Sequence, residues 1–440
     1  MIPLKDMPSW GNLRPARARV FSPSWKPSSL PGPGPFLPYG LGKSYGDSCL
    51  LDAGTMIETR FLDRIRSFNP SSGLLRAQAG ISLDAILRFS VPRGWFLPTT
   101  PGTALVTLGG AMANDVHGKN HHRAGCLGNH IPAFELLRSD GSLLTCRAGD
   151  PMHAATLGGL GLTGLITEAD IQLVPIQSAF LDVELIRFNG LDEFLALSAE
   201  SSTPWEHTVA WIDCVAGGTS LGRGIFIRGN WSDQGKLIVH RPARLSIPLN
   251  LPSATLNRLS VTAFNTLYYR RFLGKSKTLH QHYAPFFYPL DSLHQWNRIY
   301  GKRGFYQYQC LIPPAAGTQP MELILKKIAA SGQASFLAVL KTFGNLPSPG
   351  MLSFPAPGIT LALDFPERGQ RTRELFANLD SIVRDAGGHL YPAKDARMNP
   401  EDFQTFYPML DTFRPYLDPA FSSNFWQRMH PHAAASSRPT

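Results

Sequence analysis

Apolar positions recur along the chain either every second residue or every three to four residues, which predicts a mixture of strands and helices. The predicted elements in the first 180 or so residues are short. A helix is predicted over residues 82–94, because Ser82 is a favoured N-cap and Pro92 and Gly94 end the apolar pattern. Strands are predicted over residues 74–80 and 161–175, and a β-hairpin over residues 133–146.

From about Leu181 onward the predicted elements are longer. Strands are predicted over residues 180–188, 207–215, 224–231, 304–313, 335–343 and 359–365, helices over residues 191–200, 320–332 and 370–388, and irregular chain over residues 240–300. This order is typical of an α+β domain in which helices cover one face of a largely antiparallel sheet. The other face of the sheet is then free to bind a ligand.

Period-two alternation predicts which side chains share that free face. In residues 304–313, Gln307 and Gln309 lie on one face, opposite Tyr306 and Tyr308. In residues 359–365, Thr360, Ala362 and Asp364 lie opposite the apolar residues Leu361, Leu363 and Phe365. Two glutamines on one face fit either a solvated surface or the wall of a pocket, and the pattern alone leaves both interpretations open.

Composition narrows the class of protein. The chain has 440 residues, of which 43% are hydrophobic and 17% charged, so a globular protein of two or about three domains is expected. The net charge of +10 favours an anionic partner. Because no nucleic-acid-binding module is recognisable, we expect a phosphorylated ligand or an anionic membrane surface rather than nucleic acid. The five cysteines are widely spaced and indicate neither a disulfide framework nor a zinc site. Neither a signal peptide nor a membrane span is recognisable, so a cytoplasmic location is expected.

A first glycine-rich stretch, GLGKSYGD, runs from Gly40 to Asp47. Its Gly-Lys-Ser suggests a phosphate-binding loop. The nucleoside-triphosphate motif G-x-x-x-x-G-K-[ST] fails, however, because Leu37 stands where the first glycine is required. A dinucleotide-binding turn and an ordinary glycine turn remain as alternatives.

A second glycine-rich run extends from Thr100 to His130 and contains four histidines, His117, His121, His122 and His130. The spacing H-x-x-x-H-H fits no common zinc site and acidic partners are few, so no metal site is predicted. Small residues at this density allow the backbone to approach another group closely. A flat cofactor ring packed against the backbone would require that approach.

These motifs, in this order, resemble one known family. GLGKSYGD, VTLGGAMANDVHGKNHH and LGGLGLTGLI are similar to FAD flavoproteins of the vanillyl-alcohol-oxidase type, and more narrowly to decaprenylphosphoryl-β-D-ribose oxidases. The resemblance continues through FYQYQCLIP, SFLAVLKTFG, LDFP and YPAKDAR, and therefore covers nearly the whole chain from about Gly40.

The resemblance implies a two-domain FAD-binding fold. Residues 1–178 would form the first part of the FAD domain, residues 179–388 an inserted substrate domain built on an antiparallel sheet, and residues 389–440 a segment that completes the FAD domain. It also implies an FAD-dependent oxidation of a secondary hydroxyl on a polyprenyl-phosphate-linked pentose, giving a keto-sugar in the first half of an epimerisation. The implied partners are a lipid-linked sugar phosphate, a keto-sugar reductase, and peripheral contact at the inner face of the membrane. An oxidase of soluble alditols or aldonolactones on the same scaffold is the alternative.

The resemblance further implies residue roles. Lys394, Tyr391 and His117 would be catalytic, with Lys394 orienting or deprotonating the sugar hydroxyl. FAD would be bound by Gly40, Leu41, Gly42, Lys43, Ser44, Tyr45, Gly46, Asp47, Gly102, Thr103, Thr107, Gly109, Gly110, Asn114, Asp115, His117, Gly118, Asn120, Gly161, Gly164 and Ile166. Substrate would contact Trp211, Phe287, Leu290, Gln307, Gln309, Lys341, Thr360 and Ala362.

Three features depart from the family pattern. Lys43 stands where many members of the superfamily carry a histidine bonded to the flavin, so non-covalent FAD is predicted. The helix usual before the first glycine stretch is replaced by the proline-rich residues 22–35, in which a helix cannot persist. Near the flavin, Ala362, Thr360 and Phe287 replace a cysteine, an asparagine and a tyrosine of mycobacterial members, which leaves the glycosyl substrate open.

Overall fold

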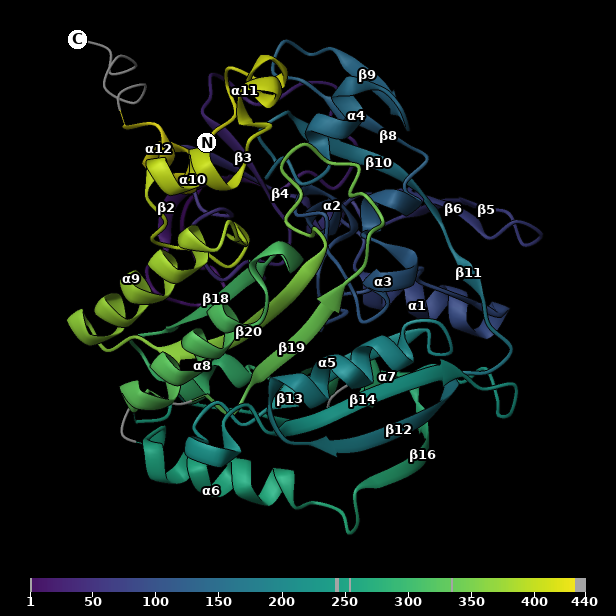
Figure 1. Cartoon of the computed structure of the whole chain (residues 1–440). Helices are drawn as coiled ribbons and strands as arrows, with labels where there is room; N and C mark the ends of the chain where they lie inside the picture. The colour runs from purple at the N-terminus through teal and green to yellow at the C-terminus, as the bar shows by residue number, and fades with distance from the viewer. Residues whose placement is uncertain (1, 242–244, 253–254, 334, 432–440) are drawn as a thin grey trace.

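The computed structural model describes residues 2–241, 245–252, 255–333 and 335–431. The first part of the chain forms two larger sheets (Figure 1). One has the order β1-β2-β4-β3, with β2 and β3 both parallel to β4, and the other is antiparallel with the order β5-β6-β10-β8-β9. Their strands are β1 (Leu4–Met7), β2 (Ala16–Phe21), β3 (Phe36–Tyr39), β4 (Thr55–Glu58), β5 (Ile65–Phe68), β6 (Leu74–Gln78), β8 (Ala133–Leu137), β9 (Leu143–Arg147) and β10 (Leu165–Gln172).

Short helices pack against these sheets, and the predicted local features are present. Helix α1 (Leu83–Ser90) begins at Ser82, whose hydroxyl accepts from the Ala85 amide at 3.0 Å. Strands β8 and β9 form the predicted hairpin. No helix or strand occurs between Ser22 and Pro35, as the prolines there predict. The other elements of this region are β7 (Trp95–Phe96), β11 (Val174–Pro175), α2 (Leu108–Ala113), α3 (His121–Ala124) and α4 (Pro151–Thr156).

The second part of the chain is built on one eight-stranded sheet of order β16-β12-β14-β13-β19-β20-β18-β21, antiparallel throughout. Its strands are β12 (Phe180–Phe188), β13 (His207–Ile212), β14 (Gly224–Trp231), β16 (Ser276–His282), β18 (Phe305–Ile312), β19 (Ala338–Phe343), β20 (Gly358–Pro366) and β21 (His389–Leu390). The mixed α+β class and the large antiparallel sheet were both predicted from the sequence. The sheet includes β21, so it runs two residues past the boundary proposed at residue 388.

Three helices cover one face of this sheet (Figure 1). They are α5 (Gly190–Ser201), α8 (Gln319–Ser331) and α9 (Gln370–Asp385). The apolar residues Leu361, Leu363 and Phe365 of β20 pack in one core with Ile324 of α8 and Phe376 of α9. Tyr306 and Tyr308 also meet the Phe376 ring. The alternation predicted for β18 and β20 is therefore confirmed, and the two glutamines point away from the helices.

Residues 240–300 are not irregular, contrary to the sequence prediction. They contain helix α6 (Arg258–Tyr269), the edge strand β16, helix α7 (Tyr283–Phe287) and the two-residue strands β15 (Leu245–Ser246) and β17 (Leu293–His294), which pair in parallel. Helix α6 has no clear apolar stripe by which it could be predicted, because it buries only Val261 and Asn265 completely. Strand β16 is polar, as edge strands often are, so it lacks the apolar alternation by which strands are recognised.

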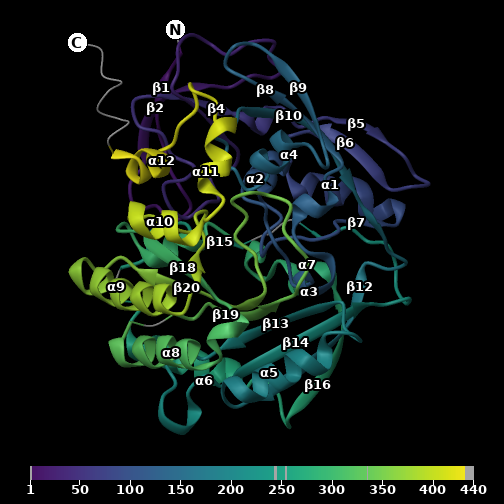
Figure 2. The same ribbon diagram turned by 45° about the horizontal axis from the view of Figure 1, so that its top comes forward.

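The C-terminal helices α10 (Pro400–Phe406), α11 (Leu410–Phe413) and α12 (Asn424–Met429) lie against the N-terminal strands (Figures 1 and 2). Phe36 of β3 bridges to Phe421, and the Phe36 amide donates to the Ala420 carbonyl at 2.7 Å. Arg138 pairs with the buried carboxylate of Asp418. The two ends of the chain thus share one unit of structure, although the domain boundaries themselves stay a prediction. Among the described residues, no helix combines the length and apolar character that crossing a bilayer requires.

Candidate functional site

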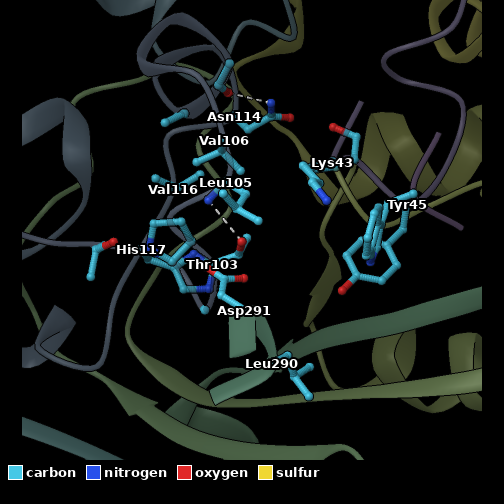
Figure 3. Close-up of a pocket in the computed structure, with 18 of the residues that line it drawn as sticks. Lys43, Tyr45, Thr103, Leu105, Val106, Asn114, Val116, His117, Leu290 and Asp291 are labelled. Atoms are coloured by element: carbon cyan, nitrogen blue, oxygen red, sulfur yellow. Dashed lines mark hydrogen bonds between the residues drawn. The ribbon is translucent and has the colours of Figure 1, made fainter. Parts of the chain in front are cut away.

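A cavity of about 740 Å³ lies between the N-terminal sheets and the face of the eight-stranded sheet opposite α5, α8 and α9. Its walls come mainly from the first glycine stretch, the second glycine run, residues 160–166, residues 268–296, one face of the eight-stranded sheet, and the loop that follows β21. Figure 3 shows Lys43 and Tyr45 on one side of this space and Val106, Val116 and His117 on the other. Residues far apart in the sequence, such as Lys43 and Lys394, therefore meet at one site.

The first glycine stretch forms a tight turn after β3. At Gly42 the φ angle is +61°, a conformation that favours glycine, and an added Cβ would meet the Tyr39 hydroxyl at 2.1 Å. At Gly40 a Cβ would lie 2.3 Å from the Thr107 hydroxyl. The absence of side chains thus lets this turn contact the start of α2, which brings the two glycine-rich segments together at the cavity.

The second glycine run continues this wall through α2. Thr107 caps α2 by accepting from the Gly110 amide at 3.1 Å, and Gly109 packs on Ala79 so closely that a Cβ would lie 3.0 Å from the alanine Cβ. The Asn114 amide donates to the Gly110 carbonyl at 2.8 Å, one of the bonds drawn in Figure 3. The wall is therefore largely backbone.

The opposite wall is the face of the eight-stranded sheet that lies away from α5, α8 and α9. Seven strands contribute to it, mostly through side chains that share this face: Leu185, Val209, Trp211, Ile227, Leu279, Gln281, Gln307, Gln309, Val339, Lys341 and Ala362. The sequence left open whether Gln307 and Gln309 are solvated or line a pocket. The structure answers this, because both are buried and both line the cavity.

Four lysines line the cavity, and burial lowers the pKa of each. The pKa falls to about 8 for Lys43, Lys119 and Lys394 and to about 7 for Lys341, because desolvation disfavours the ammonium form. The exposed Arg271 also borders the cavity, whereas Asp291 is its one carboxylate among the described residues. This balance of charges favours an anionic ligand.

Lys394 lies in the loop after β21. Its ammonium is 4.1 Å from the centroid of the Tyr45 ring, and the nearby Asp364 carboxyl partly offsets the lowering of its pKa by burial. Asp364 is fully buried behind the wall, where it accepts from Gln307 at 2.7 Å and from the Tyr300 hydroxyl at 3.2 Å. Burial raises the pKa of Asp364 to about 7. Lys394, Gln307 and Asp364 thus form one polar cluster at the end of the cavity.

His117 faces the same end of the cavity from the second glycine run. Its Nε2 lies 3.2 Å from the amide nitrogen of Gln309, which can only donate, so the proton of the neutral ring sits on Nδ1. Burial lowers the pKa of His117 well below its usual value, and the ring is therefore neutral. In the structure Nδ1 is buried and has no partner. A neutral donor is consequently available to a ligand.

The other three histidines of this run bond backbone groups. His121 accepts from the Gly344 amide, His122 bonds the Trp205 carbonyl and His130 bonds the Ala124 carbonyl. Each ring is thus held by backbone groups of a different segment, and these bonds account for the histidine-rich pattern without a shared ligand.

Tyr391 lines the cavity, but its hydroxyl is already engaged. It donates to the Asn114 carbonyl at 2.7 Å, and burial raises its pKa well above the usual value. A phenol in this state does not accept the proton of a substrate. Tyr391 ties its loop to the second glycine run, and the catalytic role expected for it stays a prediction.

Most of the residues predicted for the site line one cavity. These are Gly40, Leu41, Gly42, Lys43, Ser44, Tyr45, Gly102, Thr103, Thr107, Gly109, Gly110, Asn114, His117, Gly118, Gly161, Gly164, Ile166, Trp211, Phe287, Leu290, Gln307, Gln309, Lys341, Ala362, Tyr391 and Lys394. Their meeting is a geometric finding, and their individual roles stay predictions.

Five predicted residues lie behind the wall instead. Gly46 packs against the Asp395 carbonyl, and Asp47 pairs with Arg428. Asp115 accepts from the Gly128 amide and the Ser353 hydroxyl, Asn120 donates to the Pro98 carbonyl, and Thr360 donates to the Cys310 carbonyl. These groups are satisfied within the protein, so they support the wall rather than face the cavity.

The sequence interpretation missed three charged residues of the site: Lys119, Asp291 and Asp364. Asp364 lies on the face predicted to be free, next to Ala362, and that alternation is a signal that was available. Lys119 lies between the predicted residues Gly118 and Asn120. Asp291, which accepts from the Ala104 amide at 2.7 Å, comes from the region predicted to be irregular, and no local pattern marks it.

The cavity fits FAD in its chemistry. Glycine-rich backbone and lysines suit a pyrophosphate, and adding Cβ atoms at Gly40 or Gly42 would block the turn that borders the cavity. The partnerless Nδ1–H of His117 and the apolar side chains of the sheet face suit a flat heteroaromatic ring with acceptor atoms.

Comparisons with known proteins agree with this chemistry. A family model described as an FAD binding domain matches residues 33–147. A protein of Streptomyces coelicolor without a described function is 32% identical over 79% of this chain and 100% of its own length. D-lactate dehydrogenase of Anaerostipes hadrus is 20% identical over 34% of this chain and 33% of its own length. Decaprenylphosphoryl-beta-D-ribose oxidase of Mycolicibacterium smegmatis is 34% identical over 97% of both chains, and this chain therefore belongs to the family of that FAD-linked oxidoreductase.

Proposed function

We propose that the protein oxidises a secondary hydroxyl of a polyprenyl-phosphate-linked pentose to a keto-sugar. The full-length similarity to decaprenylphosphoryl-beta-D-ribose oxidase carries this proposal. The cavity supports it, because its glycine-rich walls offer backbone for a non-covalently bound dinucleotide and its other walls offer lysine and glutamine side chains for a sugar. The keto-sugar product would require a reductase to complete an epimerisation, and that enzyme is the proposed partner.

FAD, when bound by the two glycine-rich segments, supplies the two-electron acceptor. Removal of the hydroxyl proton falls to the protein, and Lys394 suits this role. With its pKa lowered to about 8 by burial, a substantial fraction of Lys394 is neutral near physiological pH, and neutral Nζ accepts a proton. Asp364, close by, stabilises the ammonium that results.

Gln307, Gln309 and Lys341 would orient the sugar. Gln307 is fixed by Asp364 and Gln309 by His117, so both amides are held in place before a ligand arrives. Lys341 donates to the Gly118 carbonyl at 3.2 Å and lies on the strand beside Ala362. With its pKa lowered to about 7, Lys341 would regain its charge on meeting an anionic group.

Anaerobic reduction of the flavin tests the proposal. Lipid-linked ribose phosphate in detergent should bleach the visible flavin absorbance, whereas xylitol and gulonolactone should not. Bleaching by either soluble compound and not by the lipid-linked sugar would overturn the proposal in favour of the alditol or aldonolactone alternative. If none of the three bleaches a flavin that dithionite does reduce, the assigned substrate class is wrong.

A further inference from the structure

Helix α6 presents leucine side chains to solvent. Its buried residues Val261 and Asn265 face the domain, whereas Leu259 is 82% exposed and Leu267 73% exposed on the outward side. In the turn that follows, Leu273 is 95% exposed. Single exposed leucines are ordinary, but three within 15 residues indicate a surface that another phase or partner covers. Figure 1 shows α6 at the edge of the molecule opposite the two termini.

The same part of the chain is strongly basic. Between Gln234 and Leu290 the sequence contains eight lysines and arginines and neither aspartate nor glutamate, although the net charge of the whole chain is only +10. Arg258, Arg270 and Lys277 in this stretch are exposed, and Lys275 pairs at the surface with Glu193 of α5. A basic surface with protruding leucines is complementary to an anionic lipid headgroup layer.

Helix α6 also forms part of the cavity wall. Tyr268 and Arg271 line the cavity. The Tyr268 ring lies 4.6 Å from the Trp211 ring of the sheet wall, and the Arg271 guanidinium lies 4.1 Å from the centroid of the Tyr268 ring. The exposed leucines and the cavity edge are therefore held on one rigid helix and the turn after it.

We propose that Leu259, Leu267 and Leu273, with Arg258, Arg270 and Lys277, form a surface that docks on an anionic phospholipid bilayer. We call these six residues the α6 surface. Docking here would hold the cavity edge formed by Tyr268 and Arg271 against the lipid. The inference rests on the proposed function in one respect: it gives a lipid-linked sugar a route to the cavity without complete transfer through water.

Vesicle co-sedimentation of the flavin-loaded enzyme, without substrate, tests the α6 surface. Vesicles of phosphatidylcholine with phosphatidylglycerol should bind the enzyme, and vesicles of phosphatidylcholine alone should bind it much less. The triple variant Leu259→Gln, Leu267→Gln, Leu273→Gln should weaken binding by at least about tenfold, because each leucine loses apolar burial. Leu323→Gln, at a 43% exposed leucine on α8, is the matched control and should bind as the unmodified enzyme does. Each of Arg258→Gln and Lys277→Gln should weaken binding about fivefold. Salt at 0.5 M shortens the Debye length to on the order of a few ångströms, so it should reduce the electrostatic part of the binding.

Two outcomes would overturn the proposal: no binding to anionic vesicles, or equal binding by the triple variant and the Leu323→Gln control. Sedimentation velocity without vesicles provides a third. If the unmodified enzyme self-associates and the triple variant does not, a second copy of the chain covers the α6 surface instead. Flavin absorbance and the unfolding temperature of each variant report folding. Because no substrate is present, a failure of docking is distinct from a failure of the proposed reaction, which is measured by bleaching in detergent.

Discussion

At the level of single residues, the site is defined by half-buried lysines that line the cavity. Each loses solvation in the cavity wall, and the lowered pKa values of Lys119, Lys341 and Lys394 record that loss. Poorly solvated lysines do not stabilise the fold, so their presence in the cavity wall indicates that they bind a ligand or take part in a reaction. A lysine with a pKa near 8 is also able to cycle between ammonium and amine close to neutral pH.

Replacing Lys394 should separate catalysis from cofactor binding. In Lys394→Met, the rate of flavin reduction by substrate should fall by about 10²- to 10⁴-fold, the range for a lost general base. In the unmodified enzyme that rate should rise with pH through about 8 as Lys394 loses its proton, and the variant should lack this limb. Anaerobic stopped-flow reduction across pH 6.5–9.5, roughly bracketing the lysine pKa, gives both results.

The matched control for Lys394→Met is Lys327→Met, at an exposed lysine on α8. It should change neither the rate nor the pH profile. If Lys394→Met keeps the rising limb, another group accepts the proton, and Lys341, with a pKa of about 7, is the next candidate.

Lys43 bears on how FAD is held. Its ammonium lies 3.2 Å from the centroid of the Trp10 ring, and burial lowers its pKa to about 8. An amine fixed over an indole is not positioned as an imidazole nucleophile for the flavin ring, so we predict that FAD dissociates. Precipitation of the protein with acid should leave the yellow colour in the supernatant, and mass spectrometry should find the unmodified polypeptide mass. Colour retained in the washed pellet would contradict the prediction.

At the level of elements, the sequence predicted what depends on local pattern. The alternation in β18 and β20 placed Gln307, Gln309 and Ala362 on the open face, and the caps and glycines placed α1, α8 and α9. It did not predict α6 and β16, because an exposed helix and a polar edge strand bury too little apolar surface to leave a pattern. Asp291 was missed as a site residue because its partner, the Ala104 amide, lies far away along the chain.

The C-terminal helix α12 connects two parts of the site through Arg428, and this connection can be tested. Arg428 donates to Asp47 at 2.8 and 3.0 Å and to Asp395 at 3.0 Å. Asp47 ends the first glycine stretch and Asp395 follows Lys394, so one guanidinium holds both segments. Arg428→Met should lower the free energy of unfolding by about 3 kcal/mol, because the Asp47 and Asp395 carboxylates lose their shared guanidinium and Asp395 keeps only the amides of Arg397 and Met398. It should also weaken FAD binding.

The control for α12 is Arg414→Met. Arg414 pairs with Asp411 at the surface, and a loss of less than about 1 kcal/mol is expected for such an exposed pair. Thermal unfolding followed by the fluorescence of released FAD measures both variants. Equal unfolding temperatures in Arg428→Met and Arg414→Met would show that α12 does not support the site.

At the level of the whole molecule, the cavity is assembled from chain segments that fold into different sheets. The first glycine stretch belongs to the N-terminal sheets, Gln307 and Lys341 to the eight-stranded sheet, and Lys394 to the loop that the C-terminal helices hold in place. The positive charge in the cavity is therefore a property of the assembled fold. Desolvating these lysines lowers the free energy of unfolding of the whole protein.

This destabilisation predicts how stability depends on pH. Between pH 7 and 9 the unfolded chain keeps its lysines protonated, with a usual pKa of 10.5, while folded Lys119, Lys341 and Lys394 lose protons at about 7 to 8. The unfolded state then binds more protons than the folded state, so stability rises with pH, by up to about 1.4 kcal/mol per pH unit for each lysine. The rise should end near pH 9, where unfolded cysteines ionise while buried thiols such as Cys214 and Cys310 stay protonated because burial raises their pKa to about 12. Unfolding temperatures of the flavin-free protein should therefore increase from pH 7 to pH 9.

Lys341→Met should unfold at a higher temperature at pH 7 and show a shallower rise, whereas Lys327→Met should match the unmodified protein. A flat or falling profile over this range would mean that the cavity lysines are well solvated, and the argument for Lys394 as the proton acceptor would lose its basis.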